Sequence, residues 1–201
     1  MTSPQLQGIS ALDYLAKYCI LSEQQLKRYS TVFQSVDLDR DGFINHREVE
    51  FGIRAVNNSM LTNKEVSYVD VVLDIRGSGE ISFRMFAVIC ALSERVAALD
   101  TMVKTMINKM DTRAMERKMQ GCKDMFYLLD EKEDGFVEME MLVREVRAGQ
   151  ITQEHEDLIV NKFSENGKCF VDFLDFLTYI PLFMEIHDTI NSNPLDLDRY
   201  M

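Results

Sequence analysis

Residues 37–48, DLDRDGFINHRE, place oxygen-bearing side chains at alternating positions and end on a glutamate. Carboxylates held this close together repel one another unless a cation lies between them. Calcium takes about six to eight oxygen ligands, which a loop of about twelve residues supplies from positions 1, 3, 5, 7, 9 and 12. The spacing therefore predicts a calcium site. Its expected ligands are Asp37, Asp39, Asp41, the backbone carbonyl of Phe43, Asn45 and Glu48.

The glycine and the flanking helices agree with such a loop. Gly42 occupies position 6, where the chain turns sharply and a residue without Cβ is preferred. Apolar residues at three- and four-residue spacing indicate an amphipathic helix on each side. They are Tyr29, Val32, Phe33 and Val36 before the loop, and Val49, Ile53 and Val56 after it. This arrangement resembles an EF-hand, which implies Ca²⁺ as the bound ion, with Mg²⁺ as a competitor.

The same frame recurs three times with substitutions that weaken it. The recurrences are DIRGSGEISFRM (74–85), DEKEDGFVEMEM (130–141) and SENGKCFVDFLD (164–175). In residues 74–85, position 3 is Arg76 and position 12 is Met85. In residues 130–141, position 3 is Lys132 and position 12 is Met141. A positive charge and a thioether are poor ligands for a hard cation. The sequence therefore predicts one competent calcium site.

The fourth frame is the most altered. It has Cys169 where glycine is expected but keeps Asn166, Asp172 and Asp175, so weak binding of calcium or magnesium stays an alternative there. The weakened loops are expected to serve the fold by pairing with a neighbouring loop. The expected pairs are Ile44 with Ile81 and Val137 with Val171.

Loop spacing and the scarcity of helix breakers predict the architecture. The loops start 37, 56 and 34 residues apart, and the chain has only nine Gly and three Pro. We expect an all-α fold of two paired lobes joined by a long helical linker, with short β ribbons between paired loops. The expected segments are an N-terminal helix (1–22), lobe 1 (23–93), the linker (94–118), lobe 2 (119–184) and a C-terminal tail (185–201).

Over roughly residues 23–184 the chain resembles four-hand proteins of the calmodulin and troponin C type. More narrowly, GEISFRMFAVICAL and FYLLDEKEDGF resemble segments of the small EF-hand proteins of cilia and sperm flagella. The resemblance implies a sensor or light-chain role in which each lobe binds an amphipathic helix of a protein partner. The departures at three loops imply that lobe 2 keeps one conformation at every calcium level.

Composition excludes several other classes of partner. The formal net charge of −11 disfavours nucleic acid, because phosphate binding needs the opposite sign. No apolar run approaches the roughly 20 residues of a membrane span, and the first residues lack a signal peptide's features. The four cysteines are scattered, as is typical of reduced thiols. We expect a cytoplasmic protein, with a cilium or flagellum as an alternative.

No constellation of catalytic residues is recognisable. His46, His155 and His187 are isolated in the sequence. His155 and Glu156 open like a zinc-protease helix, but Ile159 stands where the second histidine is required. Neither a glycine-rich phosphate loop nor a nucleophilic serine motif occurs. The sequence predicts that the chain is not an enzyme.

The expected linker is rich in methionine and in basic side chains. Met102, Met106 and Met110 fall at four-residue steps, and Met115 and Met119 repeat the step. A stripe buried against lobe 2 and an adaptable binding surface both fit this spacing. The basic side chains suit either an acidic partner or a solvated helix face.

Both ends of the chain carry apolar residues. Near the N-terminus, Leu12, Leu15, Ile20 and Leu21 are expected to cover lobe 1. In the tail, Leu195, Leu197 and Tyr200 suit docking into a groove, either of this chain or of a partner, although terminal tails are usually loose.

Two functional hypotheses follow. In the first, the chain is a calcium-binding regulatory or adaptor protein, whose single site shifts lobe 1 while lobe 2 stays bound to a partner helix. In the second, it is a constitutive structural subunit of a larger assembly, such as a ciliary or flagellar axoneme, with little response to calcium.

Overall fold

The structure is a computed structural model that describes residues 9–148, 153–164 and 169–185. Its first half contains α1 (Ala11–Tyr18), α2 (Glu23–Val36), β1 (Phe43–Ile44), α3 (His46–Val56), α4 (Asn63–Leu73), the short 3₁₀ helix η1 (Ile75–Gly77), β2 (Ile81–Ser82) and α5 (Phe83–Ala98). Its second half contains α6 (Thr101–Lys109), α7 (Glu116–Leu129), β3 (Phe136–Glu138), α8 (Met139–Ala148), α9 (Gln153–Ser164), β4 (Phe170–Asp172) and α10 (Phe173–Thr178). Residues 180–185 are again helical. The predicted all-α class is confirmed. None of the described helices is long and apolar enough to cross a bilayer.

Reciprocal capping sets the start of three helices. At α2 the Ser22 hydroxyl accepts from the Gln25 N–H, and the Gln25 side chain accepts from the Ser22 N–H. Thr62 with Glu65 repeats this arrangement at α4, and Asn45 with Glu48 repeats it at α3. At α3 the cap therefore uses two of the predicted metal ligands.

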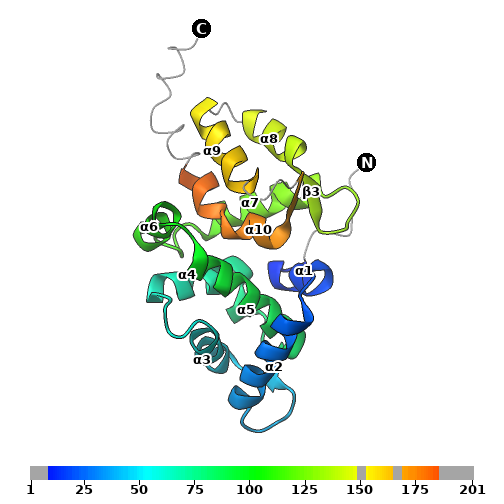
Figure 1. Cartoon of the computed structure of the whole chain (residues 1–201), viewed down its shortest axis with the longest axis vertical. Coiled ribbons are helices and arrows are strands. Elements are labelled where there is room, and N and C mark those ends of the chain that lie inside the picture. The colour runs from blue at the N-terminus through cyan, green and yellow to red at the C-terminus, as the bar shows by residue number, and fades with distance from the viewer. Residues whose placement is uncertain (1–8, 149–152, 165–168, 186–201) are drawn as a thin grey trace.

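Two antiparallel ribbons join the four loops in pairs. β1 pairs with β2, placing Ile44 opposite Ile81, and β3 pairs with β4, placing Val137 opposite Val171. Both predicted pairings are confirmed, and all four side chains are buried. We call α2–α5 with the first ribbon the N-terminal lobe, and α7–α10 with the second ribbon the C-terminal lobe. They form the lower and upper parts of Figure 1.

The segment expected as one long helical linker is divided into shorter helices. α5 ends at Ala98, and the Asp100 carboxylate begins α6 by accepting from the N–H groups of Met102 and Val103. A stretch with turns, residues 110–115, then separates α6 from α7. Because the chain changes direction at both breaks, the two lobes lie against each other, with α6 beside their junction (Figure 1).

The lobes are joined by buried polar contacts. Tyr68 of α4 donates a hydrogen bond to the carbonyl oxygen of Leu177 in α10. Lys123 of α7 donates to the carbonyl oxygen of Val72 in α4, at 3.2 Å. Burial lowers the pKa of Lys123 from its ordinary value, although nearby acidic groups oppose the shift. These contacts make the arrangement of the lobes specific.

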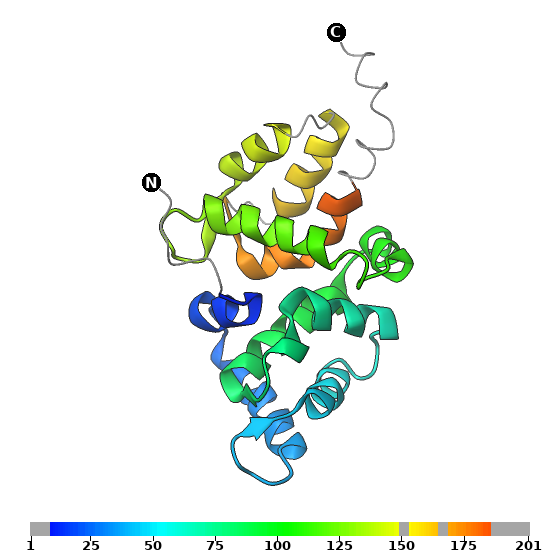
Figure 2. The same cartoon turned by 180° about the vertical axis from the view of Figure 1, so that it is seen from behind.

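Helix α1 lies where the two lobes meet (Figures 1 and 2). Leu12 and Leu15 are buried, as predicted, but the Ile20 side chain is 83% exposed and the prediction is wrong for it. Arg84 of α5 donates to the carbonyl oxygen of Ala16 at 2.8 Å and also to that of Cys19, which fixes the end of α1 against the N-terminal lobe.

Gly52 allows a close approach of α3 to Phe86 of α5. A Cβ built at Gly52 would lie 2.5 Å from Cε2 and 2.6 Å from Cζ of the buried Phe86 ring. We expect Gly52→Ala to lower the free energy of unfolding by about 1–3 kcal/mol, because the core must shift to admit the methyl group. Urea denaturation monitored by circular dichroism measures this change.

The matched control is Gly121→Ala in α7, where a Cβ meets nothing within 4 Å. This change is expected to raise the free energy of unfolding by about 0.5–1 kcal/mol through helix propensity. Equal effects of the two substitutions would contradict the contact between Gly52 and Phe86.

Alkaline pH is expected to destabilise the fold through buried tyrosines. Burial raises the pKa of the Tyr14, Tyr29, Tyr68 and Tyr127 hydroxyls above their ordinary value of 10.0. The folded chain therefore keeps protons that the unfolded chain releases. The contribution of these groups is fully present below about pH 10, and the free energy of unfolding falls as the pH rises above that value. Urea denaturation across this range measures the fall.

Tyr127→Phe tests the same point at one residue. The Tyr127 hydroxyl is buried, and within the described residues it has no hydrogen-bond partner. The substitution is expected to increase stability at neutral pH and to make the alkaline loss shallower. A free energy of unfolding that stays constant or rises above about pH 10 would contradict the burial of these hydroxyls.

Candidate metal centre

The loop between α2 and α3 folds around the side chain of Asp37. Asp37 ends α2, and its Oδ2 accepts a hydrogen bond from the N–H of Gly42 at 3.2 Å. Gly42 adopts a φ of 88°, in the region that favours glycine. Asp39 Oδ1 accepts from the Asp41 N–H at 3.4 Å, and Asp41 Oδ1 accepts from the Phe43 N–H at 2.8 Å. Local turns thus bring the three carboxylates together.

The three aspartates fit a divalent cation. One ligand oxygen from each of Asp37, Asp39 and Asp41 lies within 4.8 Å of the others. Asp37 is buried, and its Oδ1 has no hydrogen-bond partner within the described part of the chain. A buried acceptor left unpaired costs about 1–3 kcal/mol. A set of carboxylate oxygens containing one such atom suits a hard cation such as calcium.

The remaining side-chain ligands of the prediction begin α3. Asn45 Oδ1 accepts from the N–H groups of Arg47 and Glu48, at 2.9 and 3.2 Å, and Glu48 Oε2 accepts from the Asn45 N–H at 2.7 Å. The first turn of α3 is therefore built from two residues that the prediction places at the metal. The bond between Glu48 and Asn45 must be shared or released if both Glu48 oxygens are to reach an ion.

In the second loop, the basic residue at position 3 turns away from the loop. Arg76 Nε lies 2.7 Å from Asp70 Oδ2, and His46 Nε2 lies 2.9 Å from the other oxygen of the same carboxylate. Asp74 has a φ of 53° and is followed by η1. Asp70 interrupts the apolar stripe of α4 because it serves this polar contact, for which the sequence offers no local signal.

In the third loop, a tyrosine from α1 engages the residue at position 1. The Tyr14 hydroxyl donates to Asp130 Oδ2, which also accepts from the Gly135 N–H at 2.9 Å. Asp130 is buried. Lys132 at position 3 lies 3.6 Å from Glu138 at position 9, so the loop supplies its own positive charge.

In the fourth loop, an arginine from the other lobe engages the acidic residues. Arg95 of α5 pairs with Asp175, and its Nη2 lies 3.6 Å from Asp172 Oδ2. Asp172 also begins α10 by accepting from the Asp175 N–H at 2.7 Å. Asn166, the third residue of the weak-site alternative, lies outside the described residues.

The four loops therefore differ in which protein groups contact their carboxylates. Protein groups contact Asp130, Asp172 and Asp175, and two of these groups, Tyr14 and Arg95, come from outside the C-terminal lobe. Sequence reasoning did not identify either partner, because each lies far along the chain from the residue it contacts.

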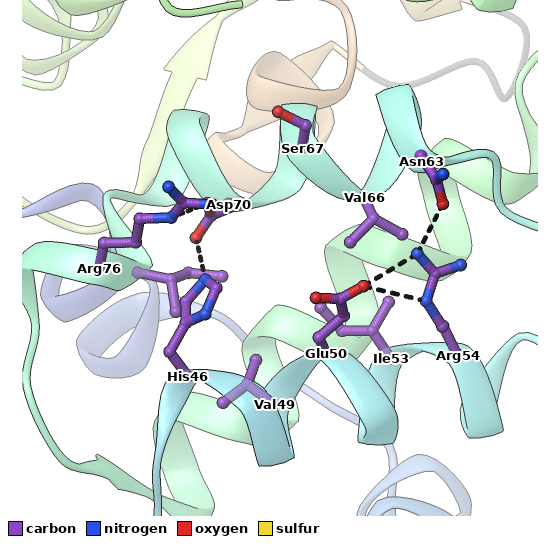
Figure 3. Close-up of a pocket in the computed structure, with 11 residues that line it drawn as sticks. His46, Val49, Glu50, Ile53, Arg54, Asn63, Val66, Ser67, Asp70 and Arg76 are labelled. Atoms are coloured by element: carbon purple, nitrogen blue, oxygen red, sulfur yellow. Dashed lines mark hydrogen bonds and ion pairs between the residues drawn. The ribbon is translucent and has the colours of Figure 1, made fainter.

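A cleft lies between α3 and α4, and His46 in the first turn of α3 lines it (Figure 3). Its volume is about 230 Å³, and Val49, Ile53 and Val66 contribute apolar side chains to its lining. The contact of His46 with Asp70 closes one end. At the other end, Arg54 Nη2 donates to Glu50 and to Asn63, both at 2.9 Å. Polar contacts at its two ends thus join α3 to α4.

Comparison with known proteins places this chain beside calcium-binding proteins. No family model matches it. Troponin C isoform 1 of Homarus americanus is 24% identical over 159 residues, covering 78% of this chain and 95% of the relative. The probable calcium-binding protein CML21 of Arabidopsis thaliana is 30% identical over 160 residues, covering 76% of this chain and 66% of the relative. Calcium-dependent protein kinase 22 of Arabidopsis thaliana is 31% identical over 85 residues, which is 41% of this chain but 17% of the kinase.

Proposed function

Because this chain belongs to the EF-hand superfamily, among proteins similar to troponin C and the calmodulin-like proteins, we propose that it is a calcium-binding regulatory protein with one competent site, at residues 37–48. The observation that carries the proposal is the Asp37 carboxylate. Its Oδ1 is a buried acceptor without a partner in the described chain, and it lies beside Asp39 and Asp41.

The ligands of the proposed site are those that the loop frame assigns. They are Asp37, Asp39, Asp41, the carbonyl of Phe43, Asn45 and Glu48. A bound calcium ion supplies the positive charge that these oxygens lack. Three of the carboxylates come from the loop, and the fourth, Glu48, comes from α3, so binding links the loop to that helix.

Regulation is proposed to act through α3. Glu48 and His46 lie in the first turn of α3, and His46 contacts Asp70 at one end of the cleft between α3 and α4. Calcium binding at Glu48 is therefore expected to alter the contacts that join α3 to α4. An amphipathic helix of a protein partner is the proposed target, and the cleft is the part of the N-terminal lobe that would respond.

A second candidate function is a constitutive subunit of a larger assembly, for example an axoneme. The observation that favours it is the set of protein contacts at the altered loops. Tyr14 at Asp130 and Arg95 at Asp172 and Asp175 hold the C-terminal lobe to other parts of the chain. In this case calcium either occupies the first loop at all times or has no role.

Calcium titration by calorimetry of the full chain, in millimolar magnesium, tests the proposed site. We expect one binding event of roughly micromolar affinity, within the range of EF-hand sensors. Absence of binding would contradict the proposed site. Affinity so high that resting calcium saturates the loop would favour the constitutive subunit.

The affinity of the full chain for its protein partner, measured with calcium and with a chelator, separates the two candidates. A regulatory protein changes affinity between the two conditions. Equal affinity in both would support the constitutive subunit.

A further inference from the structure

The methionines of the α6 region line a groove. The groove has a volume of about 450 Å³ and lies between α6, the stretch that follows it, and residues 181–185. The methionines in its lining are Met102, Met106, Met110, Met115 and Met184. Met102 is 39% exposed, Met106, Met110 and Met115 are half-buried, and Met119, which does not line the groove, is buried. Of the two interpretations of the methionine stripe, the adaptable binding surface fits Met102, Met106, Met110 and Met115.

The groove combines an apolar floor with a surround of mixed charge. Flexible thioether side chains suit an apolar ligand of irregular shape. Lys109, Asp111 and Glu185 line the groove, and the whole stretch 101–118 carries five basic and two acidic side chains in a chain whose net charge is −11. An apolar occupant fits the floor, and one that carries charges of both signs can pair with the groups of the surround.

We propose that the groove binds the chain's own C-terminal segment, residues 194–201. The segment reads PLDLDRYM, in which Leu195, Leu197, Tyr200 and Met201 are apolar, Asp196 and Asp198 are acidic and Arg199 is basic. Its composition therefore matches both the floor and the surround of the groove.

The position of the segment in the chain supports contact within one molecule. Glu185, the last described residue, itself lines the groove. Leu195 is the tenth residue after it, and an extended chain of about ten residues reaches roughly 35 Å. Helix α6, with nine residues, is about 14 Å long. The segment after Glu185 is therefore long enough to span the length of α6. This contact would exclude other ligands from the groove, and it does not depend on the proposed calcium site.

Methyl spectra of the full chain, labelled with ¹³C at the methionine methyl groups, test the proposal. The test variant carries Leu195→Asp and Leu197→Asp, and the control carries Ser192→Asp and Asn193→Asp, which add the same charge without removing apolar groups. We expect the test variant to shift the resonances of Met102, Met106, Met110 and Met115 but not that of Met60. The control should shift none of them. Resonances that are the same in all three chains would overturn the proposal.

Oxidation by peroxide gives a second readout, since exposure controls the reactivity of a thioether. We expect the groove methionines of the test variant to oxidise at least about threefold faster than those of the parent chain. Lys109→Glu should have a smaller effect in the same direction, and Lys27→Glu on α2 should have none. Unchanged rates in the test variant would overturn the proposal.

Dilution separates contact within one chain from contact between two copies. Resonances of the parent chain that do not change on dilution support binding within one molecule. Groove resonances that move toward those of the test variant on dilution would show that the tail of a second copy fills the groove, which overturns the proposal. Groove resonances that do not change in the tail variants would indicate that a separate partner, and not the tail, binds the groove. This result also overturns the proposal.

Discussion

Glu48→Gln is expected to reduce the calcium affinity of the chain by at least about 100-fold, because ligand charge tunes such loops over several decades. Glutamine can still accept the hydrogen bond from the Asn45 N–H, so the cap at the start of α3 is kept. The substitution thus removes a negative charge from the site without removing the helix start. Calorimetry of the variant and the parent chain under identical conditions measures the change.

Asp37→Asn separates metal binding from folding in the same loop. It should also weaken calcium binding, yet it should raise the free energy of unfolding in calcium-free buffer by roughly 1 kcal/mol, since it removes a negative charge that lies beside those of Asp39 and Asp41. The matched control is Asp134→Asn in the third loop, at the position that Asp41 occupies in the first. Calcium affinity that survives Glu48→Gln, or falls equally in Asp134→Asn, would contradict the single proposed site.

Tyr14→Ala is expected to lower the free energy of unfolding by about 3–5 kcal/mol, as for other buried aromatic side chains. The Tyr14 side chain is 1% exposed and contacts the rings of Phe126, Tyr127 and Phe173 in the C-terminal lobe. Because α1 is also fixed to the N-terminal lobe by Arg84, we expect the variant to unfold in two separate transitions. Denaturation followed by calorimetry measures both effects.

Tyr29→Ala is the matched control for this prediction. Tyr29 is also fully buried, and its hydroxyl also donates to a carboxylate, that of Glu94, but this pair lies within the N-terminal lobe. Tyr29→Ala should lower the free energy of unfolding by a similar amount, but the chain should still unfold in a single transition. Tyr14→Phe should cost about 1–3 kcal/mol, because it leaves the buried Asp130 carboxylate with one partner fewer. A single transition in Tyr14→Ala would show that α1 does not join the lobes.

The altered loops have a structural role that their ligand positions do not reveal. In the third and fourth loops, Tyr14 and Arg95 come from outside the C-terminal lobe and reach acidic residues at former ligand positions. These contacts hold the acidic residues of both loops to protein groups from other parts of the chain. Among the described residues, the first loop keeps a buried carboxylate oxygen, Asp37 Oδ1, without a hydrogen-bond partner.

The candidate site and the loop pairing could be predicted from the sequence because both depend on short-range geometry. Asp37, Asp39 and Asp41 lie within five residues of one another, and turns within the loop bring them together. The pairing of Ile44 with Ile81 follows from the alternation of side chains along a strand, once the loops are aligned by their glycines. Periodicity likewise identified the flanking helices.

Tertiary structure decided how the lobes pack and what occupies the altered loops. Tyr14 and Asp130 are 116 residues apart, so no local pattern connects them. The break between α5 and α6 contains neither Gly nor Pro, and Asp100 interrupts the expected linker by capping the start of α6. That break lets the lobes meet, and their meeting buries α1 and brings Arg95 to Asp172. Spacing within a segment determines local geometry, whereas contacts between lobes depend on the position of every segment between them.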